Sequence, residues 1–79
     1  MEPMRLRWPC GSLRRDAAAR RARAAAVESL RQTYRALRAN DSAFQMAQDR
    51  LAVEQLIYER AALECRCRAL LRELRGGRA

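Results

Sequence analysis

Large apolar side chains recur at every seventh position through the middle of the chain. Two turns of an α-helix return a side chain to the same face, so this spacing predicts a helix that packs along another helix. We call these six positions the heptad ladder. They are Leu30, Leu37, Phe44, Leu51, Tyr58 and Cys65.

A second apolar stripe begins inside the ladder and continues toward the C-terminal end. Leu56 follows Leu51 by five residues, which rotates the second stripe by about 140° around the helix. A helix with two apolar faces can contact two neighbours, as in a bundle, and one broad interface over both stripes explains the pattern equally well. The stripe comprises Val53, Leu56, Leu63, Cys67, Leu70 and Leu74, and Arg60 interrupts it.

The absence of helix breakers between residues 12 and 75 predicts an all-α chain. This interior contains no Gly or Pro and is rich in Ala, Leu, Arg, Glu and Gln, the residues that favour helix most. Ser12 is a suitable N-cap, and Gly76 and Gly77 are typical of a helix end. We therefore expect an irregular basic tail over 1–11, an Ala/Arg-rich basic helix over 12–28, a heptad-repeat interaction region over 29–75 and a C-terminal tail over 76–79.

A break at 40–42 is the alternative to one long coiled-coil-forming helix over about 12–75. Asn40 tolerates the left-handed conformation that ends helices, and Ser42 with Gln45 has the spacing of a capping box. Such a break would fold the chain into an αα-hairpin. The ladder keeps its phase across the site, however, and this slightly favours the continuous helix.

Arginine makes the N-terminal half strongly basic. The chain has a net charge of +8, with seventeen basic residues that are all Arg and with no His. Residues 1–40 carry +7 of this charge, whereas residues 41–79 carry only +1. A basic helix of this kind can bind an anionic partner or remain a solvated extension. The candidate anionic-partner contacts are Arg14, Arg15, Arg20, Arg21 and Arg23.

The sequence predicts no catalytic, cofactor-binding or metal-binding residues. His and Lys, the usual general base and Schiff-base nucleophile, do not occur, and no Gly-rich phosphate loop is present. Cys65 and Cys67 would point about 200° apart on a helix and cannot share a metal ion. We therefore expect a non-enzymatic protein with reduced thiols, located inside the cell, and no transmembrane segment.

The basic helix that runs into the ladder resembles the basic leucine-zipper family. Nine residues separate Arg20 from Leu30, and Ala17, Ala18 and Ala19 fall where that family carries small residues. The resemblance implies a dimeric nucleic-acid binder. Ser12 occupies the place of the base-reading Asn, which speaks against sequence-specific DNA recognition.

The segment 33–38, TYRALR, is similar to the motif of the LYR proteins, which are small helical assembly factors of mitochondria. Thr33 stands where that family has Leu. The resemblance implies a mitochondrial protein that is handed to a partner, and an Arg-rich, acid-poor N-terminus is compatible with import. The sequence does not decide between mitochondrial and nuclear or cytoplasmic locations.

The favoured interpretation is a helical, coiled-coil protein–protein interaction protein that serves as a small subunit or adaptor of a larger complex. Its partner is another helical protein, either a second copy or a different chain. The mitochondrial assembly factor and the dimeric nucleic-acid binder are the alternatives. The predicted partner-binding residues are Leu30, Leu37, Phe44, Leu51, Leu56, Tyr58, Leu63, Leu70 and Leu74.

Overall fold

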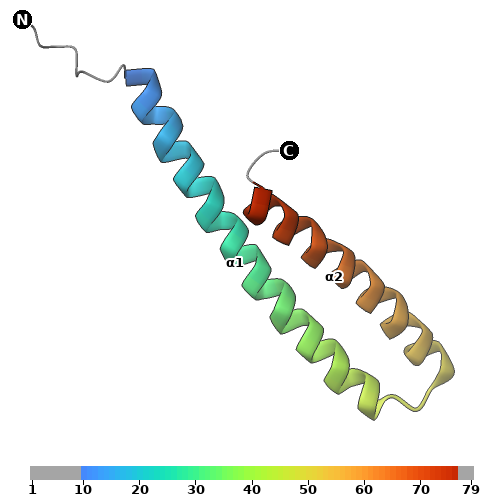
Figure 1. Cartoon of the computed structure of the whole chain (residues 1–79). Helices are drawn as coiled ribbons and strands as arrows, with labels where there is room; N and C mark the ends of the chain where they lie inside the picture. The colour runs from blue at the N-terminus through green and yellow to red at the C-terminus, as the bar shows by residue number, and fades with distance from the viewer. Residues whose placement is uncertain (1–9, 77–79) are drawn as a thin grey trace, which may run out of the picture.

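The computed structural model describes residues 10–76, which form two α-helices joined by a short turn (Figure 1). Helix α1 spans Cys10–Met46 and helix α2 spans Arg50–Gly76. The two helices run antiparallel and lie side by side, so the all-α prediction is confirmed. Most of the predicted N-terminal tail and residues 77–79 of the predicted C-terminal tail lie outside the described residues.

The chain takes the hairpin alternative, but the turn lies at 47–49 and not at 40–42. The Ala47 amide donates to the Phe44 carbonyl at 3.3 Å and closes the end of α1. The Asp49 carboxylate accepts the Ala52 amide at 3.1 Å, which is the geometry of an N-cap for α2. Asp49 therefore performs the capping that the sequence analysis assigned to Ser42, which lies inside α1.

Small side chains form the α1 side of the interface between the helices. Ala26, Thr33 and Asn40 are spaced seven residues apart and are only 5%, 3% and 5% exposed. The Thr33 hydroxyl donates to the Ser29 carbonyl at 2.8 Å, so its burial leaves no unsatisfied polar group there. Because these side chains are short, the backbone of α2 can approach α1 closely.

Large side chains form the α2 side of the same interface. Each member of the second apolar stripe is half-buried, whereas most of the intervening residues of α2 are exposed. Leu56 and Leu63 contribute with Ala36 and Ala43 to one wall of the contact region. The second stripe of α2 therefore packs on the small residues of α1, and the interface is asymmetric in side-chain size.

Helix α1 extends beyond the end of α2 at its N-terminal side (Figure 1). Near the C-terminal end of α2, Arg23 Nη1 donates to the Leu74 carbonyl oxygen at 3.0 Å. The last carbonyls of a helix have no intrahelical donor and carry partial negative charge, so a guanidinium is favourable there. Arg23 thus joins the C-terminal end of α2 to α1.

The hairpin has a small hydrophobic core. Among the described residues, Ala26 is the only hydrophobic residue that is fully buried, and large apolar side chains remain exposed on both helices. A chain this short buries little surface within its own interior. The exposed large side chains are Leu13, Tyr34, Phe44, Met46, Leu51, Ile57, Tyr58 and Leu71.

Candidate interaction surfaces

The turn divides the heptad ladder between the two helices. Leu30, Leu37 and Phe44 belong to α1, whereas the following members of the ladder belong to α2. Because the chain reverses between Phe44 and Leu51, the two parts do not form one continuous stripe. The ladder keeps its seven-residue phase across 40–42 because α1 is continuous there. This phase does not continue through the turn at 47–49.

One broad side of the hairpin carries the α1 part of the ladder together with apolar side chains of α2. Asp41 and Phe44 line a hollow of 340 Å³ with Arg60, and Leu71 lines another of 350 Å³ with Arg23. Residues of the two helices that line the same hollow lie on the same side of the hairpin. Helical spacing from these residues assigns the remaining positions to that side. We call this side the apolar face. It consists of Leu30, Tyr34, Leu37 and Phe44 of α1 and Ile57 and Leu71 of α2.

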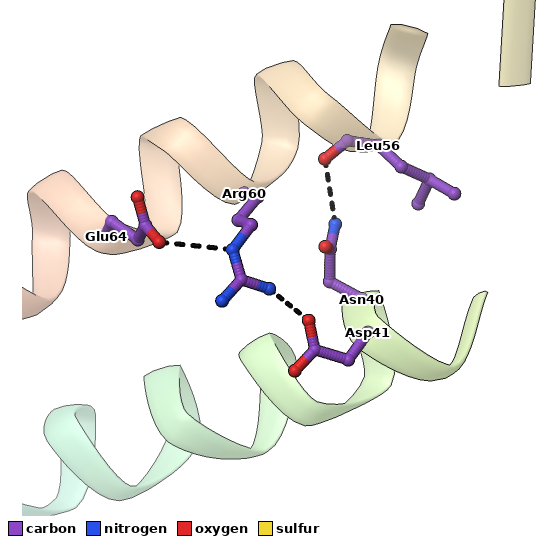
Figure 2. A network of polar contacts seen from close by, with 5 residues as sticks. All are labelled: Asn40, Asp41, Leu56, Arg60 and Glu64. Carbon is purple, nitrogen blue, oxygen red and sulfur yellow. Dashed lines mark hydrogen bonds and ion pairs between the residues drawn. The ribbon is translucent and has the colours of Figure 1, made fainter. Parts of the chain in front are cut away.

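A polar network crosses the apolar face near the turn (Figure 2). Arg60 of α2 forms an ion pair with Asp41 of α1, and its Nε donates to Glu64 Oε2 at 3.1 Å. The hydrogen bond that Arg60 donates to Asp41 raises the pKa of the Arg60 guanidinium above its ordinary value, so this group stays charged. Arg60, the residue that interrupts the second stripe, therefore links α2 to α1.

Asn40 fixes the register of the helices beside this network. Its Nδ2 donates to the Leu56 carbonyl oxygen at 3.0 Å, as Figure 2 shows. Its Oδ1 is buried and has no hydrogen-bond partner within residues 10–76. A buried Asn in a helix interface lowers stability but selects one alignment. Asn40 therefore acts as an alignment residue within α1, where the sequence analysis had considered a helix break.

The two cysteines of α2 face different ways, as their spacing predicted. Cys67 lies half-buried in the interface, and Cys65 is exposed. A side-chain hydrogen bond with Cys67 raises the pKa of the Tyr34 phenol above its ordinary value of 10.0. Within residues 10–76, no group of three or more His, Cys, Asp or Glu side chains gathers where it could hold a metal ion.

The remaining ladder residues lie on the side of α2 that points away from α1. Leu51 is 72% exposed and Tyr58 is 74% exposed, and Cys65 follows at the same spacing. We call these three residues the outer face. Met46, 78% exposed, lies next to the turn. These are the largest apolar exposures among the described residues, so the outer face is a strong candidate for contact with another molecule.

A groove runs between the helices on the side opposite the apolar face. It has a volume of 550 Å³ and is lined mainly by alanine. Its lining residues are Ala36, Ala39, Asn40 and Ala43 of α1 and Leu56, Glu59, Ala62 and Leu63 of α2.

The predicted anionic-partner contacts lie in the N-terminal part of α1. Arg14, Arg15, Arg20 and Arg21 are exposed. Arg23, the fifth predicted contact, is engaged with the Leu74 carbonyl. The structure therefore leaves four of these arginines along the part of α1 that extends toward and beyond the end of α2 (Figure 1).

The predicted partner-binding residues divide into three groups. Leu56, Leu63, Leu70 and Leu74 belong to the second stripe, are half-buried and face α1 of the same chain, whereas Phe44, Leu51 and Tyr58 are exposed. Leu30 and Leu37 are half-buried beside the interface. The exposed residues Leu13, Tyr34, Met46, Ile57 and Leu71 were not among the predicted partner-binding residues. The heptad of small residues in α1, four positions before the ladder residues, was the signal that assigns the intramolecular interface.

Comparison of the chain with protein-family models, with curated proteins and with solved structures finds no match. Neither α1 nor α2 contains a stretch apolar enough, over a sufficient length, to cross a bilayer. The case for a function therefore depends on the surfaces described above.

Proposed function

We propose that this helical hairpin is a non-enzymatic protein–protein interaction module, a small subunit or adaptor that docks on helical partners through its exposed apolar side chains. One observation carries the proposal. Eight large hydrophobic side chains are exposed among the described residues, whereas Ala26 is the only fully buried hydrophobic residue there. Exposed apolar side chains on this scale, in a chain with so little core, support a partner that covers them.

The outer face supplies the clearest contact residues. Leu51 and Tyr58 are each about three-quarters exposed, and they lie two helical turns apart on α2. Covering these side chains would contribute roughly 1.5–3 kcal/mol per residue before the costs of association. Two such residues at heptad spacing fit the surface of a partner helix.

Affinity purification of the tagged chain from its own cell, followed by mass spectrometry, tests this proposal. Leu51→Asp should remove the helical partners that the wild-type chain retains, because it places a charge on the outer face. Leu13→Asp is the matched control, since Leu13 is also exposed but lies in the N-terminal part of α1. Equal recovery of every partner with Leu51→Asp and with Leu13→Asp contradicts the proposed role of the outer face.

The four exposed arginines of α1 favour an anionic partner as a second candidate function. Arg14, Arg15, Arg20 and Arg21 lie on consecutive turns, and a helix of this kind can neutralise phosphates. The test is titration of duplex DNA at several salt concentrations. Affinity that falls steeply with salt, and that is lost when the four arginines are replaced by Ala, would support this candidate. Affinity that does not change with salt ends it.

A further inference from the structure

We propose that the outer edge of α1 binds the phosphate backbone of a duplex nucleic acid, while the outer face of α2 binds a helical protein on the opposite side of the hairpin. This inference rests on the proposed function and deepens it, because it names the two kinds of partner that the adaptor joins. It differs from the second candidate function in the arginines that contact phosphate. We call these residues the basic edge: Arg14, Arg21, Arg31, Arg35 and Arg38.

Helical spacing places the basic edge on the side of α1 that points away from α2. The buried residues Ala26 and Thr33 mark the direction of α2. A side chain two residues further along a helix points about 200° away, and Arg35 follows Thr33 in this way. Arg14 and Arg21 repeat the position of Arg35 at heptad spacing, and both are exposed.

The other two members of the edge lie within about 60° of this row, since Arg31 precedes Arg35 by four residues and Arg38 follows it by three. Glu28 belongs to the same row and forms ion pairs with Arg31 at 3.3 Å and with Arg35 at 3.6 Å. The side chains of Arg31 and Arg35 nevertheless remain 65% and 57% exposed. The other two acidic residues in the described part of α1 lie at heptad positions of the apolar face. The edge therefore carries five positive charges and one negative charge.

The composition of the basic edge favours nucleic acid over a protein or a membrane. Apart from Glu28, the remaining positions of this side between residues 14 and 45 carry Ala, Ser or Gln, and none carries a large apolar side chain. Protein interfaces have an apolar core, and basic helices bind membranes by inserting apolar side chains. Nucleic-acid interfaces are more polar and strongly positive, which matches this edge.

The aromatic side chains favour a duplex over a single strand. Single strands are held by stacking of bases on aromatic rings, but Tyr34 and Phe44 lie on the apolar face and Tyr58 lies on the outer face. Guanidinium groups instead bind phosphate oxygens directly. From Arg14 to Arg38 the edge is about 36 Å long, close to one turn of a duplex. We expect contacts to the backbone and no preference for a base sequence.

The outer face of α2 occupies the equivalent position on the other side of the hairpin. Tyr58 follows Leu56 by two residues, and Cys65 follows Leu63 in the same way, so both point away from α1. Two packed helices are about 20 Å across, so the duplex and the helical protein contact opposite edges. Each partner therefore binds without displacing the other.

Titration of a fluorescently labelled duplex with the purified full chain, at several salt concentrations, tests the inference. Arg14→Gln/Arg21→Gln removes two phosphate contacts and should lower the slope of log affinity against log salt by about two. Arg15→Gln/Arg20→Gln is the matched control, because it removes the same charge from neighbouring residues that face the groove and the apolar side of α1. This control should keep a slope close to that of the wild-type chain. Equal losses in the two variants overturn the assignment of the duplex to the basic edge.

Glu28→Gln provides a test in the opposite direction. It removes the one negative charge of the edge and releases Arg31 and Arg35, so affinity for the duplex should rise roughly twofold to fivefold. Asp16→Asn is the control, since Asp16 is an exposed acid of α1 that lies off the edge. A decrease with Glu28→Gln, or an increase no larger than with Asp16→Asn, contradicts the inference.

Duplex DNA and duplex RNA of equal length distinguish the two sources of this phosphate array, and binding of either supports the inference. Tighter binding to phosphatidylserine vesicles than to both duplexes overturns it. Leu51→Asp should bind the duplex as the wild-type chain does. If no duplex binds but Leu51→Asp still removes helical partners, the proposed function stands and only this inference fails. If the edge variants behave as expected but Leu51→Asp and Leu13→Asp recover the same partners, the basic edge stands and the role of the outer face fails.

Discussion

Replacing Ala26 by leucine should destabilise the hairpin strongly. Ala26 is 5% exposed and is the first of the three small residues on the side of α1 that packs against α2. Leucine adds three carbon atoms at a buried position of the interface. Overpacking of this kind costs about 1–3 kcal/mol. For a chain of this size, each kcal/mol lowers Tm by about 4–8 °C, so the expected decrease is roughly 5–20 °C.

Ala25→Leu is the control, because Ala25 is the preceding residue of the same helix and is exposed. Alanine and leucine both favour helix, so the two substitutions differ mainly in what the new side chain meets. Thermal unfolding followed by circular dichroism, at one protein concentration for all chains, measures the difference. If Ala26→Leu unfolds at the same temperature as Ala25→Leu, the small residues of α1 do not form the interface.

Two further predictions concern the turn and the interface. Asp49→Ala should lower the free energy of unfolding by about 1 kcal/mol, and Asp49→Ser should retain most of it, because Asp49 caps α2; equal stability of Asp49→Ala and wild type in thermal unfolding would contradict this role. The hydrogen bond with Cys67 raises the pKa of Tyr34, so its contribution to stability is complete below pH 10 and is lost as pH rises through the raised value. Cys67→Ala should return the pKa of Tyr34 toward 10.0, as measured by phenolate absorbance in chains carrying Tyr58→Phe; an unchanged titration would show that Cys67 does not hold the phenol.

The helical class of the fold could be predicted because local signals agree along most of the chain. Residues that favour helix fill the interior, and α2 ends at Gly76, the first of the two glycines expected at its end. The start of α1 at Cys10 differs from the predicted Ser12 by two residues, which is the usual uncertainty of helix ends. The second apolar stripe was also recognised, and it forms the α2 side of the interface.

The turn and the division of the surfaces could not be predicted in the same way. Ala47, Gln48 and Asp49 include no Gly or Pro, so Asp49, which caps α2 through the Ala52 amide, was the one local signal of a turn there. Asn40 carried a local signal for a helix end, but tertiary contact with Leu56 placed it inside α1 instead. The predicted interface rested on large side chains, and the heptad of small side chains was missed. Small residues indicate a helix interface only when a partner with large residues is known.

The distance between the two helices in solution tests the central claim most directly. Spin labels at positions 32 and 66 of a cysteine-free chain, diluted with unlabelled chain to suppress contacts between copies, can be measured by pulsed electron paramagnetic resonance. Packed helices lie about 8–10 Å apart, so the hairpin predicts a label separation below about 25 Å. A continuous helix would separate the same positions by about 50 Å, and a distribution centred there would contradict the account.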